Sequence, residues 1–441
     1  MKPICDFVEK YIESESVRLH MPGHKGKQHL GFEKYDITEI SGADSLYEAD
    51  GIILNSEKNA GKLFGAETFY STEGSSLCIR AMLYLVILYA KKQGKNPLIV
   101  AGRNAHKTLI HSAALLDFDI RWMYGQYSYL SCEIDLEELK RYILTENPAA
   151  VYITSPDYLG NMLDVREIAE LCHSNNTLLI VDNAHGAYLK FLSESKHPLD
   201  LGADMCCDSA HKTLPVLTGG AYLHISCSAP SVLKEQAKYA LSLFGSTSPS
   251  YLLLQSLDNA NKYLADGYAE KLNKFCFKVK KTKERFLQNG YTLVGDEPLK
   301  ITVATKVYGY TGIEFADLLY KNNIVCEFCD PDFIVFMLTP EITDEELLKF
   351  ENAMLEIKKK ECLVSAPPKI CKPEKVMSAR EALFLPKEKI PVLKSLGKIL
   401  ASPGVSCPPA VPVLVCGERI NEQSIETFKY YGISECVVVK E

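Results

Sequence analysis

Short apolar runs alternate with amphipathic stretches through the middle of the chain. Strand-like runs occupy residues 97–102, 119–124, 149–156, 177–185, 203–208 and 219–226. Stretches with helical spacing follow His106 and occupy 134–148 and 164–176, and Asp135 is positioned to cap the first of these two with Glu138 three residues on. Apolar strands separated by helices of this length predict βαβ units. We therefore expect an α/β fold with a mainly parallel central sheet covered by helices.

Polar residues stand directly after three of the predicted strands. The clusters are Asp157–Tyr158, Asp182 to His185 and Ser209 to Lys212. Ligands of open parallel sheets bind beyond the carboxyl ends of the strands, where these clusters are expected to lie. The pattern therefore predicts a functional site at this edge.

The rest of the chain predicts three parts. We expect an N-terminal arm over residues 1–45, a large domain over 46–290 and a small α/β domain over 291–441. Residues 366–375 are rich in proline and predict a linker within the last part. The longest apolar run, residues 81–90, is shorter than the roughly 20 residues that span a bilayer, so it predicts a buried helix.

Composition narrows the class of protein. The net charge of −7 gives no reason to expect nucleic acid or an anionic membrane as a partner. The first sixteen residues are charged and lack the apolar core of a signal peptide. The fifteen cysteines are then most simply reduced thiols in the cytoplasm. These features favour an enzyme that acts on a small molecule and contains no metal.

Asp182 and Lys212 have the order and setting of a pyridoxal phosphate (PLP) site. A lysine can form a Schiff base with the cofactor, and a carboxylate can keep its pyridine nitrogen protonated. Each residue also has an ordinary interpretation, because a strand-end Asp often caps a helix and a loop Lys is usually a surface charge. Lys107 is a second candidate for the lysine. We favour Lys212 because it follows the Asp182 strand by one further strand.

The phosphate of such a cofactor needs an anion site. Gly74, Ser75 and Ser76 precede a predicted helix, whose first N–H groups and serine hydroxyls could bind a phosphate. Serine-rich helix starts are also common caps. Ser209 and His211 could reach the same group. His106 follows a strand and could stack on a planar ring, although a lone histidine there is as readily structural.

Several motifs in order resemble the Orn/Lys/Arg decarboxylase family, which has the aspartate-aminotransferase-like fold of PLP fold type I. They are "RLHMPGHKG" (18–26), "FGAETFYSTEGSS" (64–76), "GRNAHKT" (102–108), "ITSPDYLG" (153–160), "IVDNAHGAYL" (180–189), "DSAHKTLPVLTGGAYLH" (208–224) and "STSPSYLLLQSLD" (246–258). The resemblance returns in "REALFLPKEKI" and "CPPAVPVLVCGERI" near the C-terminus. The chain is similar to a short member without the N-terminal wing domain of the large enzymes.

The resemblance implies a role for each of these positions. Lys212 would carry the cofactor, Asp182 would pair with the pyridine nitrogen and His106 would stack on the ring, with Ala184 and His185 on its other side. The phosphate would be held by Ser75, Ser76, Ser209 and His211.

The resemblance also implies a homodimer or larger homo-oligomer with shared active sites. Ser246 or Thr247 would reach the phosphate of the neighbouring subunit. Asp44, with "HMPGHKG", would line the entrance from an adjoining chain, and Asp44 and Glu48 are candidates to bind the distal cation of the substrate.

The chain departs from the family pattern at four positions. Glu73 stands in the turn that usually reads "TNGTT", and Asn183 replaces the acid of "VDEAHG". Cys407 and Cys416 replace a Tyr and a Pro in the C-terminal motif.

The expected activity is the PLP-dependent decarboxylation of a basic L-amino acid (lysine, arginine or ornithine) to its amine and CO₂, in polyamine biosynthesis. Two alternatives stay open. One is another reaction on PLP, such as an aminotransferase or lyase, in which Arg380 or Arg419 could clamp the α-carboxylate. The other is a PLP-fold protein without turnover.

Overall fold

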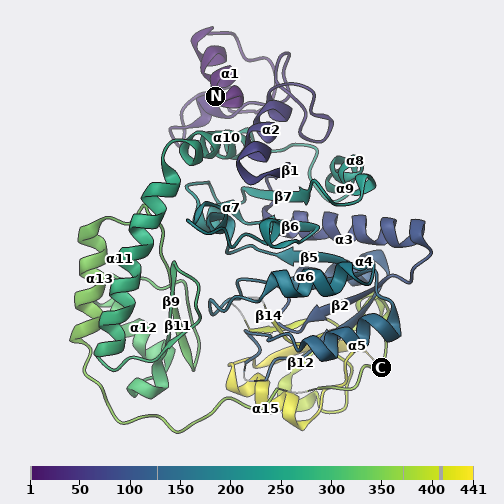
Figure 1. Ribbon diagram of the computed structural model, residues 1–441, viewed down its shortest axis with the longest axis vertical. Helices are drawn as coiled ribbons and strands as arrows, with labels where there is room; N and C mark the ends of the chain where they lie inside the picture. The colour runs from purple at the N-terminus through teal and green to yellow at the C-terminus, as the bar shows by residue number, and fades with distance from the viewer. Residues whose placement is uncertain (1, 127, 371, 407–410, 441) are drawn as a thin grey trace. The chain divides into compact units, whose positions relative to one another are not determined.

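The computed structural model describes residues 2–126, 128–370, 372–406 and 411–440. The chain packs into two compact units (Figure 1). The first unit comprises Met1–Lys95 and Val165–Lys271, and the second comprises Asn96–Asp164 and Leu272–Glu441. The division into an arm, a large domain and a small domain at residues 45 and 290 stays a prediction.

The first unit contains four strands in the order β1-β7-β6-β5. β5 (Leu178–Asp182) pairs parallel with β6 (Met205–Asp208), whereas β7 (Ala221–Ser226) pairs antiparallel with both β6 and β1 (Ala66–Ser71). Every residue of β5 and β6 is buried. Strands buried on both faces are typical of sheets covered by helices.

Helices surround these strands in the first unit. They are α1 (Pro3–Glu13), α2 (Ile52–Phe64), α3 (Gly74–Gln93), α6 (Val165–His173), α7 (Ala210–Thr213), α8 (Ser231–Glu235), α9 (Ala237–Ser242) and α10 (Tyr251–Ala265), with 3₁₀ turns η1 (Glu33–Tyr35), η2 (Leu46–Glu48), η3 (Ala187–Phe191) and η4 (Pro198–Leu201). α3 packs against β1, β5, β6 and β7. By length and composition α3 could cross a membrane, but most of its apolar stretch is buried. The buried helix predicted over 81–90 is therefore confirmed as the core helix of this unit.

The second unit holds three further parallel strands. β2 (Leu98–Gly102) pairs with β3 (Asp119–Met123) on one side and β4 (Ala150–Thr154) on the other. α4 (Lys107–Leu116) and α5 (Leu136–Glu146) follow β2 and β3 along the chain. Asp135 caps α5 through the N–H groups of Glu137 and Glu138, as predicted, but the Glu138 carboxylate bonds to Tyr142 instead of completing a capping box.

The remaining elements build smaller sheets in the second unit. The sheet order β10-β11-β9-β8 is formed by β8 (Leu293–Val294), β9 (Lys300–Ala304), β10 (Phe328–Cys329) and β11 (Phe333–Met337). Two further pairs join β12 (Lys387–Pro391) with β15 (Glu435–Val439) and β13 (Gly404–Ser406) with β14 (Val411–Leu414). The helices are α11 (Tyr268–Gln288), which starts in the first unit, α12 (Gly312–Tyr320), α13 (Asp344–Glu356), α14 (Ala379–Phe384) and α15 (Glu422–Tyr430), with turns η5 (Thr305–Tyr308) and η6 (Val392–Lys394).

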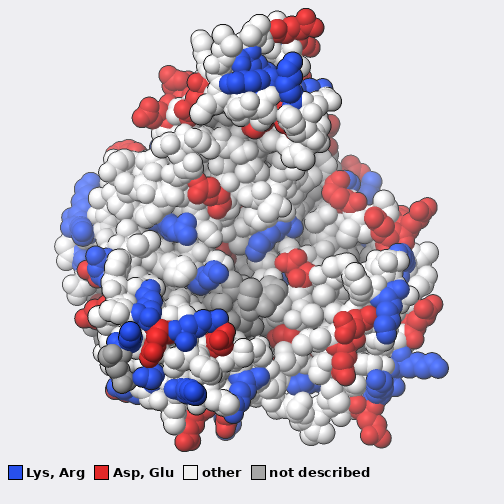
Figure 2. Space-filling model, turned by 180° about the vertical axis from the view of Figure 1, so that it is seen from behind, with Lys and Arg blue, Asp and Glu red and all other residues white. Residues whose placement is uncertain are grey.

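The surface charges agree with the modest net charge. Lys and Arg are interspersed with Asp and Glu over the face in Figure 2, and no extended patch of one sign covers it. The cysteines that the structure describes are all free thiols, most of them buried.

A buried carboxylate in the second unit gives the first testable prediction. Asp330 is 5% exposed and its Oδ1 accepts the N–H groups of Asp332 and Phe333, both at 2.7 Å. Burial, helped by the nearby Asp332, raises the pKa of Asp330 to about 6. An acid whose folded pKa lies above its unfolded pKa destabilises the fold once it ionises. Its contribution is therefore most favourable below about pH 4 and falls as the pH rises through 6.

Asp330→Asn keeps the accepting oxygen and removes the charge. We expect it to raise the free energy of unfolding by about 1–2 kcal/mol at pH 8 and to change it little at pH 4. Urea unfolding at both pH values measures this, with Asp317→Asn on the exposed face of α12 as the control. Equal effects at the two pH values would contradict the assignment.

Candidate active site

Lys212 points inward from the short helix that follows β6. It is only partly exposed, and its Nζ lies 3.0 Å from Nε2 of His185, which is 5% exposed. His185 belongs to the loop after β5, so the loops after two neighbouring parallel strands meet here. The surface-charge interpretation of Lys212 is therefore wrong. A lysine held against an imidazole can pass a proton and become the neutral amine that attacks a carbonyl.

Asp182 is the last residue of β5 and is 3% exposed. Its Oδ1 accepts the N–H of Ala184 at 3.2 Å and the thiol of Cys207 at 3.6 Å. Cys207 is its partner in the β5–β6 register. Burial raises the pKa of Cys207 well above its ordinary value, so the thiol stays protonated and donates. The carboxylate is thus oriented at the same strand end that carries His185.

The predicted phosphate cradle comes together from segments far apart in the sequence. The Ser209 hydroxyl donates to the Ser75 hydroxyl at 2.8 Å, and Gly74 N–H donates to the Gly219 carbonyl at 2.7 Å. Gly74 opens α3 with φ +70°, and no atom outside its immediate neighbours lies within 4 Å of the place of a Cβ. Two hydroxyls at a helix N-terminus that faces open space fit a phosphate. The donor set therefore fits PLP.

The other predicted phosphate ligands lie nearby in the chain. Ser76 is in the first turn of α3 and is partly exposed. His211 directs Nδ1 to the Gly220 carbonyl at 2.9 Å. Ser246 and Thr247 are exposed. The contacts of these residues with a phosphate, in this or a neighbouring subunit, stay predictions.

Glu73, the acid next to the cradle, is engaged elsewhere. It precedes α3 without capping it, and its Oε1 accepts the Ser246 N–H at 2.6 Å. This contact ties the turn before α3 to the loop before α10. The Glu73 carboxylate, which departs from the family pattern, is thus hydrogen-bonded to a backbone N–H.

His106 lies in the second unit, where it caps α4. Its Nδ1 accepts the Thr108 N–H and contacts Thr108 Oγ1 at 2.8 Å. Stacking on the cofactor ring stays a prediction. Asp157, at the end of β4, is also in this unit, where its Oδ1 accepts the N–H groups of Leu159 and Asn161. The structure therefore brings together two of the three predicted polar clusters, Asp182 to His185 and Ser209 to Lys212. Asp157 instead stabilises a turn by accepting backbone N–H groups.

Asp44 is buried within the first unit. Its carboxylate accepts N–H groups of Ser45, Asp50, Gly51, Ile53 and Leu54, the last three at the start of α2. This gives Asp44 a structural role, and its contact with substrate stays a prediction. Glu48 is exposed.

The arginines named for the aminotransferase alternative have partners within the second unit. Arg380 donates to the Ala114 carbonyl at 2.8 Å, and Arg419 pairs with Glu374 at 2.9 Å. Cys416 is buried in an apolar cluster with Ile110 and Ala382. Cys407 lies outside the described residues.

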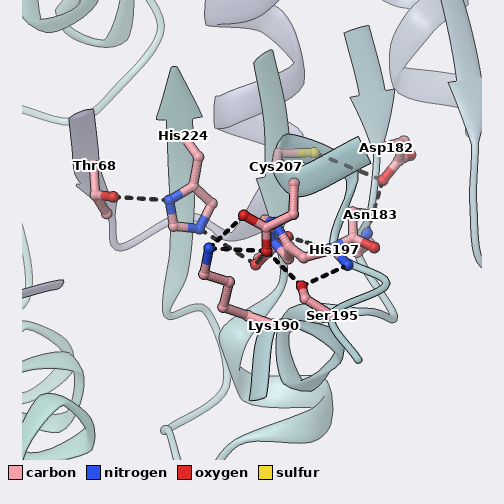
Figure 3. A network of polar contacts seen from close by, with 11 residues as sticks. Thr68, Asp182, Asn183, Lys190, Ser195, His197, Cys207 and His224 are labelled. Carbon is pink, nitrogen blue, oxygen red and sulfur yellow. Dashed lines mark hydrogen bonds and ion pairs between the residues drawn. The ribbon is translucent and has the colours of Figure 1, made fainter. Parts of the chain in front are cut away.

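Sequence reasoning missed the residues behind the site. The Cys207 thiol donates to Asp182 (Figure 3). Asp208 accepts the Asn183 amide at 2.7 Å and contacts His197 and His224. Asp208 opens the "DSAHKTL" motif, but its position beside Asn183 depends on strand pairing. A glutamate at position 183 would face this carboxylate, which accounts for the amide there.

Comparison with known proteins identifies the family of this chain. The sequence matches the family described as "Orn/Lys/Arg decarboxylase, major domain" over residues 2–298. It is 30% identical to an arginine decarboxylase of Bacillus subtilis over 96% of this chain and 92% of that protein. It is 27% identical to an arginine decarboxylase of Halalkalibacterium halodurans over 96% and 92%.

Solved structures show the same fold. The constitutive lysine decarboxylase of E. coli superposes with a TM-score of 0.78 at 17% identity, over 100% of this chain and 82% of that one. Lysine decarboxylase A from Pseudomonas aeruginosa gives 0.80 at 17% identity, over 98% and 76%. The predicted α/β fold of PLP fold type I is confirmed, and the chain belongs to the Orn/Lys/Arg decarboxylase family.

Proposed function

We propose that this protein binds PLP at Lys212 and decarboxylates a basic L-amino acid, with arginine as the first candidate. The observation that carries the proposal is the contact between Lys212 and His185 at the strand end that also holds Asp182. Arginine is favoured because the curated relatives named above, which align over nearly the whole chain, are arginine decarboxylases.

Different residues of the site would bind different parts of PLP. Lys212 would hold the cofactor covalently, Asp182 would keep a proton at the pyridine nitrogen, and Ser75 with Ser209 and the start of α3 would bind the phosphate. PLP bound in this way supplies an electron sink for the bond that breaks when CO₂ leaves.

His185 has a defined part in proton transfer. The 3.0 Å contact between its Nε2 and Lys212 Nζ requires one proton between two nitrogens. When that proton is on the imidazole, the lysine is a neutral amine, and when it is on the lysine, the imidazole accepts. The pair can thus release and take back a proton at Nζ without bulk water.

A homo-oligomer is part of the proposal. In the segment with "RLHMPGHKG", Val17 is 82%, Leu19 89% and Leu30 77% exposed. Apolar side chains this exposed are typical of a surface that a partner covers. A second copy would cover them if active sites are shared. A cytoplasmic location and a role in polyamine biosynthesis are proposed with the activity.

The aminotransferase alternative has less support. An alanine–glyoxylate aminotransferase from Nostoc superposes with a TM-score of 0.56 over 69% of this chain and 86% of that one. The lysine decarboxylases reach 0.78 or more over nearly all of it. The guanidinium groups of Arg380 and Arg419 are also engaged with their own unit.

The cofactor assignment predicts a spectroscopic result. PLP added to the purified apoprotein should give a visible absorption band, and Lys212→Ala should abolish it, because Lys212 is the proposed point of covalent attachment. Lys107→Ala is the matched control, since Lys107 was the second candidate, and it should keep the band. A band lost with Lys107 and kept without Lys212 would reverse the assignment.

The reaction predicts a product test. CO₂ release should be measured with arginine, lysine and ornithine, and we expect arginine to be turned over fastest. Lys212→Ala should lower the rate by at least about a thousandfold, because both the covalent link and the proton carrier are lost. A keto acid in place of CO₂ and amine would favour the aminotransferase alternative.

A further inference from the structure

A fully buried polar cluster lies behind the β5 and β6 ends. Asp208, His197 and His224 are each 0% exposed. Asp208 Oδ2 lies 3.0 Å from His197 Nε2 and 3.3 Å from His224 Nε2, and His224 Nδ1 lies 2.8 Å from the Thr68 hydroxyl (Figure 3). The cluster therefore joins β6, β7 and the chain before η4 at the Asp208 carboxylate, and β1 through the contact of Thr68 with His224.

The hydrogen bonds assign the protons in this cluster. Burial lowers the pKa of His224, which favours the neutral ring. A neutral His224 can accept the Thr68 hydroxyl proton through Nδ1, and its Nε2 lies 3.3 Å from Asp208 Oδ2 without a hydrogen-bond partner. Burial works to raise the pKa of Asp208, but the attraction of His197 and His224 and the hydrogen bond with His197 outweigh it and hold that pKa well below its ordinary value. Asp208 is thus an ionised carboxylate held by donors.

Two histidines and an aspartate could also form a cation site, since their ligand atoms all lie within 4.8 Å of one another. The hydrogen bonds already account for the arrangement. One Asp208 oxygen accepts the Asn183 amide, and the other is hydrogen-bonded to His197 and lies 3.3 Å from His224 Nε2, while Thr68 contacts His224 Nδ1. The cluster is explained as a hydrogen-bonded anion.

Asn183 connects this anion to the candidate active site. Its Nδ2 donates to Asp208 Oδ1 at 2.7 Å, and its backbone N–H donates to the Cys207 carbonyl at 3.1 Å. A Cβ on Gly186 would lie 2.0 Å from Asn183 Oδ1, so the amide is tightly enclosed. Asn183 stands between Asp182 and His185 in the chain, and holding it fixes the turn that carries both.

We propose that Asp208 is a positioning residue that, through Asn183, fixes Asp182 and His185 in place for the cofactor and for Lys212. The inference rests on the proposed role of Asp182 and Lys212 in binding PLP. Asp208 also directly precedes Ser209, so the same carboxylate anchors the start of the Lys212 loop. Its effect on the cofactor passes through these residues and requires no direct contact.

The test compares three variants of the full chain. Asp208→Asn removes the charge, and Asn183→Ala removes the link while leaving the two histidines on Asp208. Asp204→Asn is the matched control, because Asp204 is also buried, pairs with His173 at 3.1 Å and accepts the Leu179 N–H, but lies at the opposite ends of β5 and β6. The measurements are the melting temperature of the apoprotein, the Kd for PLP and the visible band of bound PLP across pH.

All three variants are expected to lower the melting temperature. Asp208→Asn and Asn183→Ala should in addition weaken PLP binding by about tenfold and shift the pH at which the visible band changes. Asp204→Asn should leave both cofactor properties unchanged. Because the two residues act along one connection, the double variant should bind PLP no more weakly than the weaker single one.

Several outcomes would overturn the proposal. If the Kd for PLP and the visible band changed in proportion to the loss of melting temperature in all three variants, including Asp204→Asn, Asp208 would be a purely structural residue. Additive losses in the double variant would break the connection through Asn183. A stoichiometric metal ion in the purified wild type that is lost with Asp208→Asn would make the cluster a cation site. Absence of a visible band in the wild type would instead refute the proposed function itself.

Discussion

The parallel pairing of β5 with β6 is the constraint on which the candidate site depends. It sets Asp182 opposite Cys207, so the loops that follow both strands leave the sheet at the same edge. His185 from the loop after β5 and Lys212 from α7, the short helix after β6, then come within 3.0 Å. An antiparallel pairing would send these loops to opposite edges, and the lysine would have neither an imidazole nor a strand-end carboxylate near it.

The buried carboxylates at this edge of the sheet, Asp182 and Asp208, have hydrogen-bond partners. Ionised groups are costly to bury unless they are paired and hydrogen-bonded. Asp208 meets that condition with hydrogen bonds to the Asn183 amide and His197 and a 3.3 Å contact with His224, and Asp182 accepts a thiol and a backbone N–H.

The contacts of the residues that depart from the family pattern explain three of these substitutions. Asn183 can donate to Asp208, which a glutamate could not do. Glu73 accepts the backbone N–H of Ser246, so its carboxylate is hydrogen-bonded within the first unit. Cys416 fills an apolar cluster. Lys212 and Asp182 are the residues expected of the family, and Ser75 and Ser76 keep the hydroxyl groups of the two threonines in "TNGTT".

The sequence by itself determined the α/β class, the strands at 98–102, 150–154 and 178–182, the family and the main candidates Lys212 and Asp182. These depend on local periodicity and on motifs of fixed spacing, which are written in consecutive residues. Only the tertiary structure decided that Asp157 forms a turn, that Asp44 caps a helix and that Cys207 and Asp208 support the site. Each of those roles depends on a partner from another segment, and such a partner is set by strand register and packing, which local patterns do not encode.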